Sequence, residues 1–151
     1  MNVVWYISNF ENLSAIDLYQ LLQLRINVFM IEQNCLYPEC DNKDLVSKHL
    51  FGKIDDQIIA YARLLPPHIS YEDPSIGRVI VREDKRHLKL GSILMKKAIE
   101  SISLDFPNQT IRISAQAHLQ SFYNNLGFVS TGEIYLEDNI PHIEMELKRA
   151  K

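Results

Sequence analysis

The chain has 151 residues and a formal net charge of −3, from 16 lysines and arginines and 19 aspartates and glutamates. A chain of this length usually folds as one domain that buries roughly two-thirds of its unfolded surface, so we expect a single domain over residues 1–151. Proteins that bind nucleic acid generally carry a basic surplus, so the acidic balance argues against nucleic acid as a partner.

Strands and helices are predicted to alternate along the chain. The first half predicts a strand at 3–10, a helix at 15–31 capped by Ser14, a polar loop at 33–48 and a hairpin of strands at 49–54 and 58–65. The second half predicts a strand at 76–81, a helix at 91–104, a strand at 110–115, a short helix at 119–126 that Gly127 ends, and closing strands at 128–135 and 142–147.

This order of elements implies an α/β (α+β) fold. A crossover leads from the strand at 76–81 through a helix to the strand at 110–115, which makes those two strands parallel neighbours. The hairpins on either side are antiparallel. We therefore expect a mixed, mostly antiparallel central sheet with helices on both faces.

Neither the N-terminus nor the cysteines suggest export or a metal site. Residues 1–10 contain no basic segment and no long apolar run, so we expect no signal peptide, no membrane span and a cytoplasmic location. Cys35 and Cys40 have no second pair of ligands near them, which argues against zinc. We expect two reduced thiols and no bound metal.

The most informative segment joins a strand to a helix through a basic loop. Residues 76–92 read IGRVIVREDKRHLKLGS, and Arg86, His87 and Lys89 gather where the loop meets the predicted helix. The first turn of a helix offers unpaired backbone N–H groups and the positive end of the helix dipole, an arrangement that binds anions. The segment therefore predicts a site for a ligand that carries phosphate.

Three segments together resemble a known family. They are LQLRINVFMIEQNCLYPECDNKD at 22–44, IGRVIVREDKRHLKLGSILM at 76–95 and AQAHLQSFYNNLGF at 115–128. In this order, and with the predicted order of strands and helices, they resemble the GNAT family of N-acetyltransferases, and within it the ElaA-type branch. The resemblance covers nearly the whole chain, and it implies the acyl-CoA N-acyltransferase fold with acetyl-CoA as cosubstrate.

The resemblance also implies where acetyl-CoA binds. In the family, the pyrophosphate lies on a loop of pattern R/Q-x-x-G-x-G/A, which falls here on Arg86, Lys89 and Gly91, and pantetheine pairs with a splayed strand. The expected contacts are Val79, Ile80, Val81, Arg86, His87, Leu88, Lys89, Leu90, Gly91 and Ser92. Lys89 replaces the first glycine of the pattern, and a lysine held at positive φ would cost about 1 kcal/mol or more. Its ammonium could offset that cost by contacting a phosphate.

The resemblance implies a catalytic role for Tyr123, because in the family the tyrosine of this segment often protonates the departing CoA thiolate. The ordinary pKa values of a tyrosine and a thiol differ by about 1.5 units, or ~2 kcal/mol, which is small enough for a positioned hydroxyl to act. The acceptor amine must lose a proton. Glu32 is the first candidate for the base, and the further candidates are Asp41, Asp44, His49 and His118. An acidic mouth that attracts amines is expected on the acceptor side, from Asp41, Asp44, His49 and His118.

The expected reaction is direct transfer of acetyl to a primary amine, without a covalent enzyme intermediate. The acceptor is a small molecule or a protein amine, and edge strands near the chain's end could support a homodimer. Two other functions stay open from the sequence: a CoA-binding regulatory module that does no chemistry, and acyl-homoserine-lactone synthesis on a related fold.

Overall fold

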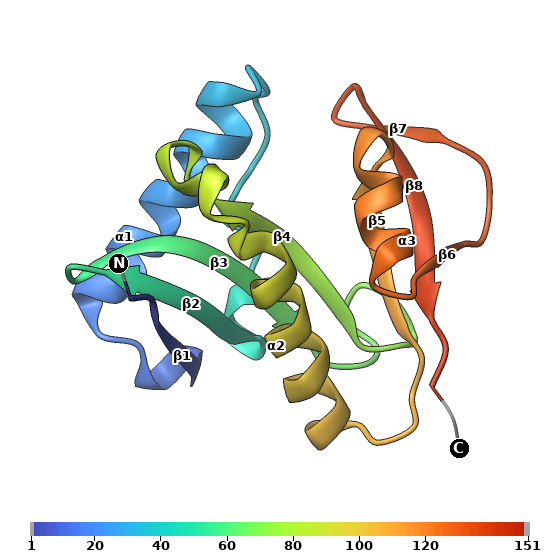
Figure 1. Ribbon diagram of the computed structural model, residues 1–151, viewed down its shortest axis with the longest axis horizontal. Coiled ribbons are helices and arrows are strands. Elements are labelled where there is room, and N and C mark those ends of the chain that lie inside the picture. Colours follow the sequence, from blue (N-terminus) through green and yellow to red (C-terminus); the bar gives the residue numbers. More distant parts are fainter. Residues whose placement is uncertain (1, 150–151) are drawn as a thin grey trace.

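The computed structural model describes residues 2–149, which form one eight-stranded sheet with helices on both faces (Figure 1). The strands are β1 (Val4–Asn9), β2 (Lys48–Ile54), β3 (Gln57–Leu65), β4 (Ser75–Val81), β5 (Ile111–Gln116), β6 (Val129–Ser130), β7 (Tyr135–Glu137) and β8 (Ile140–Leu147). The helices are α1 (Ala15–Arg25), α2 (Leu90–Asp105) and α3 (Gln120–Asn125), and the shorter 3-10 or π-helical segments are η1 (Phe10–Asn12), η2 (Ile26–Glu32), η3 (Lys43–Val46), η4 (Glu83–Leu88) and η5 (Ala117–Leu119).

The strand order confirms the predicted mixed, mostly antiparallel sheet. Neighbours run β1-β2-β3-β4-β5-β8-β6, with β7 beside β8. Among the described strands, only β4 and β5 pair in parallel. Within residues 2–149, no helix has the length and apolar character that a membrane span requires. The expected domain limits include residues 1, 150 and 151, which lie outside the described residues.

Two apolar clusters fix the helices to opposite faces of the sheet. On one face, Leu21 of α1 packs in a cluster with Tyr61 of β3 and Ile80 of β4. On the other face, α2 contributes Leu94 and Ala98 to the larger cluster, and both side chains are fully buried. Each large apolar side chain buried in this way stabilises the fold by about 1.5–3 kcal/mol. The two clusters hold β3 and β4 firmly between the helices.

Local signals in the sequence explain how the helices begin and end. Ser14 caps α1 as predicted, because its Oγ accepts a hydrogen bond from the Asp17 N–H at 3.0 Å. Gly127 follows α3 with φ 102, a left-handed conformation that glycine adopts without strain. The helix predicted at 15–31 is α-helical only in its first part. α1 ends at Arg25, and the chain continues as a π-helical segment to Glu32. Such wider turns are often found at functional sites.

The prediction of a single strand at 128–135 is wrong. The structure has two short strands there, β6 and β7, separated by residues 131–134, which include Gly132. Both pair with β8 in antiparallel register, through Val129↔Glu146 and Tyr135↔His142. A tight turn at residues 138–139, with φ 51 and 63, joins β7 to β8 and brings this hairpin back beside β5.

The parallel neighbours β4 and β5 pair only near their start. Their register consists of one pair, Ser75↔Arg112, and the two strands then diverge (Figure 1). Beyond that pair, the facing edges of β4 and β5 have no strand partner in the described sheet. Backbone N–H and C=O groups along these edges are therefore free to bind something else.

Candidate active site

A cavity of about 990 Å³ lies where β4 and β5 diverge. Its wall takes residues from both halves of the sheet, including Val79 of β4, Ser114 of β5 and His142 of β8, and from α3 it takes Tyr123. This volume is at the upper end of the range for small-molecule pockets. The cavity is large enough for an extended ligand and a second small molecule beside it.

Strand β4 carries a bulge beside this cavity. Between the pairs Tyr61↔Ile80 and Arg63↔Gly77, the β3–β4 register shifts by one residue. Arg78 accommodates the extra residue with φ 50, in the left-handed region. The predicted pantetheine-binding residues follow the bulge, and all of them line the cavity: Val79, Ile80 and Val81. Their backbone can pair with a ligand while the side chains pack.

The loop from β4 to α2 also lies at the cavity. The residues of this loop and of the α2 start that line it are Arg86, Lys89, Gly91 and Ser92. The other three residues expected there turn their side chains elsewhere: His87 is exposed, Leu88 packs against the core and Leu90 is buried in it. For these three residues a phosphate could therefore bind only the backbone N–H groups, which lie at the end of η4 for His87 and Leu88 and at the start of α2 for Leu90.

Lys89 adopts the conformation that its glycine position requires, with φ 56 and ψ 39. A left-handed residue other than glycine costs roughly 1–2 kcal/mol, while glycine loses more backbone entropy on folding by roughly 0.5–1 kcal/mol. We therefore expect Lys89→Gly to raise the free energy of unfolding by up to about 1 kcal/mol, as measured by urea denaturation. If the ammonium contacts a phosphate, the same variant should bind acetyl-CoA about 3- to 10-fold more weakly in titration calorimetry at low salt.

Lys89→Asn is the matched control, because asparagine tolerates the left-handed conformation and lacks the charge. It should lose the same affinity as Lys89→Gly. Unchanged acetyl-CoA affinity in both variants would show that Lys89 is tolerated at the glycine position and does not contact a phosphate.

Glu32, the predicted base, lies on the cavity wall in an ion pair with Arg86. The Arg86 Nη2 atom lies 2.9 Å from Glu32 Oε2, and Arg86 Nε donates to the carbonyl oxygen of Val81 at 2.9 Å. The pair therefore joins the end of η2 to the loop expected to bind pyrophosphate. This contact gives Glu32 a role in holding the Arg86 side chain, and its role as a base stays a prediction.

Tyr123 of α3 lines the same cavity with a side chain that is 7% exposed. Its ring packs edge-on against Phe122 and Phe128, with centroids 5.0 and 6.0 Å away. Burial raises the pKa of Tyr123 to about 12. Among the residues that the structure describes, no group forms a hydrogen bond with the hydroxyl, so it is free to donate one to a ligand in the cavity.

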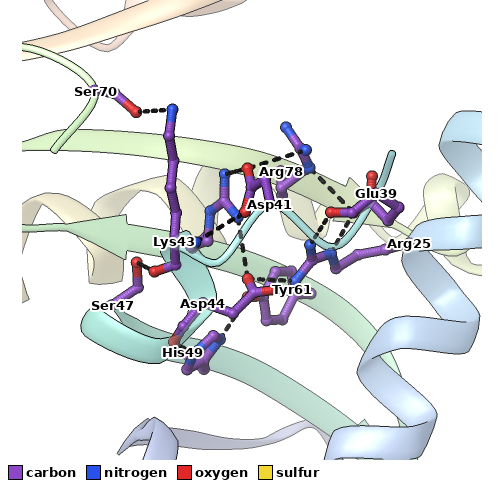
Figure 2. Close-up of polar contacts among 11 residues, drawn as sticks. Arg25, Glu39, Asp41, Lys43, Asp44, Ser47, His49, Tyr61, Ser70 and Arg78 are labelled. Atoms are coloured by element: carbon purple, nitrogen blue, oxygen red, sulfur yellow. Dashed lines mark hydrogen bonds and ion pairs between the residues drawn. The ribbon is translucent and has the colours of Figure 1, made fainter. Parts of the chain in front are cut away.

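The acidic residues expected at the acceptor mouth belong to a network of ion pairs with arginines (Figure 2). The Nη1 atom of Arg63 lies 2.8 Å from Asp41 Oδ1 and 3.0 Å from Asp44 Oδ1. Arg25 Nη1 lies 2.7 Å from the same Asp44 oxygen. The full network comprises Arg25, Arg63, Arg78, Glu39, Asp41 and Asp44. Because guanidinium groups and carboxylates are equal in number, the network is formally neutral, and the expected acidic mouth is absent from this wall.

The candidate acceptor residues divide into two groups. Asp41 and His118 line the cavity, and the His118 side chain is exposed on η5. Asp44 and His49 do not line it. His49 is 0% exposed, and its Nδ1 lies 2.6 Å from the Tyr61 hydroxyl while its Nε2 lies 2.9 Å from the carbonyl oxygen of Asp44 (Figure 2). These contacts give Asp44 and His49 a structural role, because their polar groups are already paired inside the protein.

The buried His49 makes folding stability depend on pH. Burial is the main cause that lowers the pKa of His49, so the unfolded chain binds a proton as the pH falls below the ordinary value near 6.5, while the folded chain binds it only at a lower pH. The free energy of unfolding should therefore fall from pH 7 to pH 5, by at most about 1.4 kcal/mol per pH unit from this group. Urea denaturation at several pH values should show a flatter curve for His49→Gln than for the exposed control His68→Gln.

A separate loss of stability is expected at lower pH. Although burial alone would raise them, hydrogen bonds from Arg63 and Arg25 lower the pKa of Asp41 and Asp44. Carboxylates with a lowered folded pKa stabilise the fold above their ordinary pKa near 3.9, and this contribution is lost as the pH falls through the lower folded value.

Several residues on the cavity wall were missed by sequence reasoning. Arg78 projects from the β4 bulge with its guanidinium 5.5 Å from the Tyr37 ring centroid, and Glu137 and His142 lie on the β7–β8 hairpin. The Cys35 thiol also lines the cavity and donates to the carbonyl oxygen of Asp138 at 3.3 Å. Both cysteines are free, and among residues 2–149 there is no group of three or more His, Cys, Asp or Glu that could hold a metal ion.

Comparison with known proteins identifies the family. The family model described as an acetyltransferase (GNAT) domain matches residues 25–149. The chain therefore belongs to the GNAT acetyltransferase family, whose members transfer acyl groups from an acyl-CoA, generally to amines. This confirms that the chain is an enzyme of the acyltransferase class.

Within the family, the chain is similar to ElaA. It is 43% identical to the protein ElaA of Escherichia coli over 145 residues, which cover 95% of each chain. The crystal structure of E. coli ElaA superposes with a TM-score of 0.92 at 42% identity, covering 97% of this chain and 100% of ElaA. An acyl-CoA N-acyltransferase from Pseudomonas aeruginosa gives the same TM-score at 41% identity, covering 97% of this chain and 99% of the other. The predicted resemblance to the ElaA-type branch is confirmed.

Proposed function

We propose that the protein transfers an acetyl group from acetyl-CoA to a primary amine by direct attack. The observation that carries this proposal is the cavity at the diverging strands, which combines free β4 backbone, a helix start beside Lys89 and the Tyr123 hydroxyl. The loop would hold the pyrophosphate of CoA, and β4 would pair with the pantetheine amides. A backbone N–H near Val79 would stabilise the thioester oxygen as it becomes negative.

In this proposal the acceptor enters from the side opposite the CoA loop. The cavity residues there come from the loop after η2, from the loop before β4, from Arg78 and from the β5–β8–β7 part of the sheet, and they include Tyr37, Ser70, Tyr71 and Glu137. The amine nitrogen attacks the thioester carbon, the C–S bond breaks, and Tyr123 stabilises the departing sulfur. A CoA sensor needs no group at the sulfur, so the Tyr123 side chain in the cavity supports an enzyme over a CoA-binding module.

A free-thiol assay tests the proposal directly. Purified protein is incubated with acetyl-CoA and a panel of primary amines, thiol release is followed against an amine-free control, and the acetylated product is identified by mass. We expect amine-dependent thiol release with at least one amine. Tight acetyl-CoA binding by calorimetry without transfer to any amine of a broad panel would instead favour a non-catalytic CoA-binding module.

A further inference from the structure

We propose that the acceptor amine binds against Glu137 and His142, and that His142 takes its proton. The inference rests on the proposed acetyl transfer and adds the acceptor subsite that the sequence did not indicate. The two walls of the cavity differ in how their carboxylates are paired. On the wall formed by η2, β3 and the loop between η2 and η3, the carboxylates are held by arginines, Glu32 by Arg86 and Asp41 by Arg63.

The opposite wall offers carboxylates that no arginine neutralises. Among the described cavity residues, Glu137 and Asp138 are the acids without a lysine or arginine within ion-pair distance. Asp138 lies in the exposed turn between β7 and β8. The Glu137 side chain is 49% exposed, and its Oε2 lies 3.4 Å from His142 Nε2. An ammonium ion that enters the cavity therefore finds its negative partner at Glu137.

The geometry of His142 leaves one ring nitrogen available as a base. Its Nδ1 lies 2.7 Å from the carbonyl oxygen of Ile140, and a carbonyl oxygen can only accept, so Nδ1 carries the hydrogen. In the neutral ring the lone pair is then on Nε2, which faces Glu137. The residue is 7% exposed and lines the cavity, so its ring orientation is fixed while Nε2 remains within reach of a bound molecule.

Neighbouring strands hold this pair in place. His142 pairs with Gln116 of β5 and with Tyr135 of β7, and the Tyr135 ring stacks on the imidazole at 6.2 Å. Ser114 Oγ donates to Glu137 Oε1 at 3.3 Å and also forms a hydrogen bond with the Tyr135 hydroxyl. A site on paired strands keeps its geometry better than one on a loop.

The charged and titratable groups around His142 come from three elements. Glu137 and Tyr135 face it from β7, Glu144 lies two residues further along β8, and Tyr71 contributes from the loop before β4. Burial, followed by the nearby Tyr135, Glu144 and Glu137, raises the pKa of Tyr71 to about 12. Tyr71 therefore stays neutral near pH 7, and because Arg112 Nη1 lies 2.8 Å from Glu144 Oε1, the negative charge beside His142 that no arginine neutralises is that of Glu137.

In the proposed step, the acceptor ammonium donates hydrogen bonds to Glu137 Oε2 and His142 Nε2, and it gives one proton to Nε2. The nitrogen lone pair then attacks the thioester carbon, the C–S bond breaks, and a second nitrogen proton is lost as the amide forms. The thiolate takes up one proton, so one proton is released to solvent for each amide made.

Two variants test the proposal, each with the amine that the wild type acetylates best. His142→Gln should lower kcat/KM at pH 7 at least tenfold, because general-base catalysis contributes about 10²-fold or more. It should also flatten the rise of kcat/KM with pH on the acid side, while acetyl-CoA affinity measured without acceptor stays unchanged. Glu137→Gln should raise KM for the amine at least threefold with a smaller change in kcat. His68→Gln, exposed and outside the cavity, should match the wild type.

The outcomes separate this inference from the proposed function. If the wild type acetylates no amine, the proposed function itself fails. If the wild type is active and His142→Gln shows the wild-type pH profile, whether at full or uniformly lowered rate, the inference is overturned. Should His142→Gln fail to fold, Glu137→Gln decides alone, because its half-exposed side chain can change without disturbing the core, and an unchanged KM would overturn the inference.

Discussion

Replacing Tyr123 by Phe should lower kcat for acetyl transfer about 10- to 100-fold while leaving the affinity for acetyl-CoA within about twofold. The ring of Tyr123 packs against Phe122 and Phe128 and would be retained. The substitution removes only the hydroxyl, which has no other hydrogen bond among the described residues. The loss should therefore appear in the chemical step, where the sulfur of CoA becomes negative.

The raised pKa of Tyr123 sharpens what this hydroxyl does. At a pKa of about 12, complete transfer of its proton to a thiolate of ordinary pKa near 8.5 is uphill by about 5 kcal/mol. The sequence alone suggested a difference of ~2 kcal/mol, because it could not show the burial. Tyr123 is thus better suited to stabilise the thiolate as a hydrogen-bond donor, with the final proton coming from solvent or from the attacking amine.

Steady-state kinetics and calorimetry check this prediction together. Tyr19→Phe is the matched control, because Tyr19 is 70% exposed on α1 and does not line the cavity. Tyr123 stays protonated below about pH 11. Between pH 8 and 10 its ionisation should therefore not lower the rate, and the wild type and the phenylalanine variant should have pH profiles of the same shape. An undiminished kcat in Tyr123→Phe would remove Tyr123 from the mechanism.

The sequence predicted those parts of the site whose signals are local. The Ser14 cap, the Gly127 helix end and the strand–loop–helix at 76–92 each depend on residues a few positions apart, and each is found in the structure. Even the unusual conformation at Lys89 follows from its place in a short pattern. Short-range geometry of this kind is largely set by backbone preferences and caps.

The charge balance of the acceptor side could not be predicted in the same way. Asp41 and Asp44 look acidic in the sequence, and the arginines that form hydrogen bonds with them lie 19 to 22 residues away. No spacing rule links Arg63 on β3 to an aspartate in a loop. His142 was missed because the predicted strand at 142–147 gave no sign of a polar partner, whereas β7 pairs with β8 and brings Glu137 within 3.4 Å of His142.

The largest effect on stability is expected from Arg25, the centre of the buried network. Its side chain is 0% exposed and contacts Glu39 through Nε, Asp44 through Nη1 and the Glu39 carbonyl oxygen through Nη2. Its guanidinium also lies 5.7 Å from the Tyr61 ring centroid. Arg25→Met fills a similar volume but leaves carboxylates buried without their partner, so the free energy of unfolding should fall by about 3–5 kcal/mol.

Urea denaturation at pH 7 measures this loss, and two further variants interpret it. Arg82→Met breaks an exposed pair with Asp84 and should change stability by less than about 1 kcal/mol. Arg25→Lys keeps the charge but not the fork of N–H groups, so its loss should be intermediate. A loss below about 1 kcal/mol in Arg25→Met would mean that water or proton uptake compensates the carboxylates. The loop that carries Asp41 to the cavity would then owe its position to packing and not to these ion pairs.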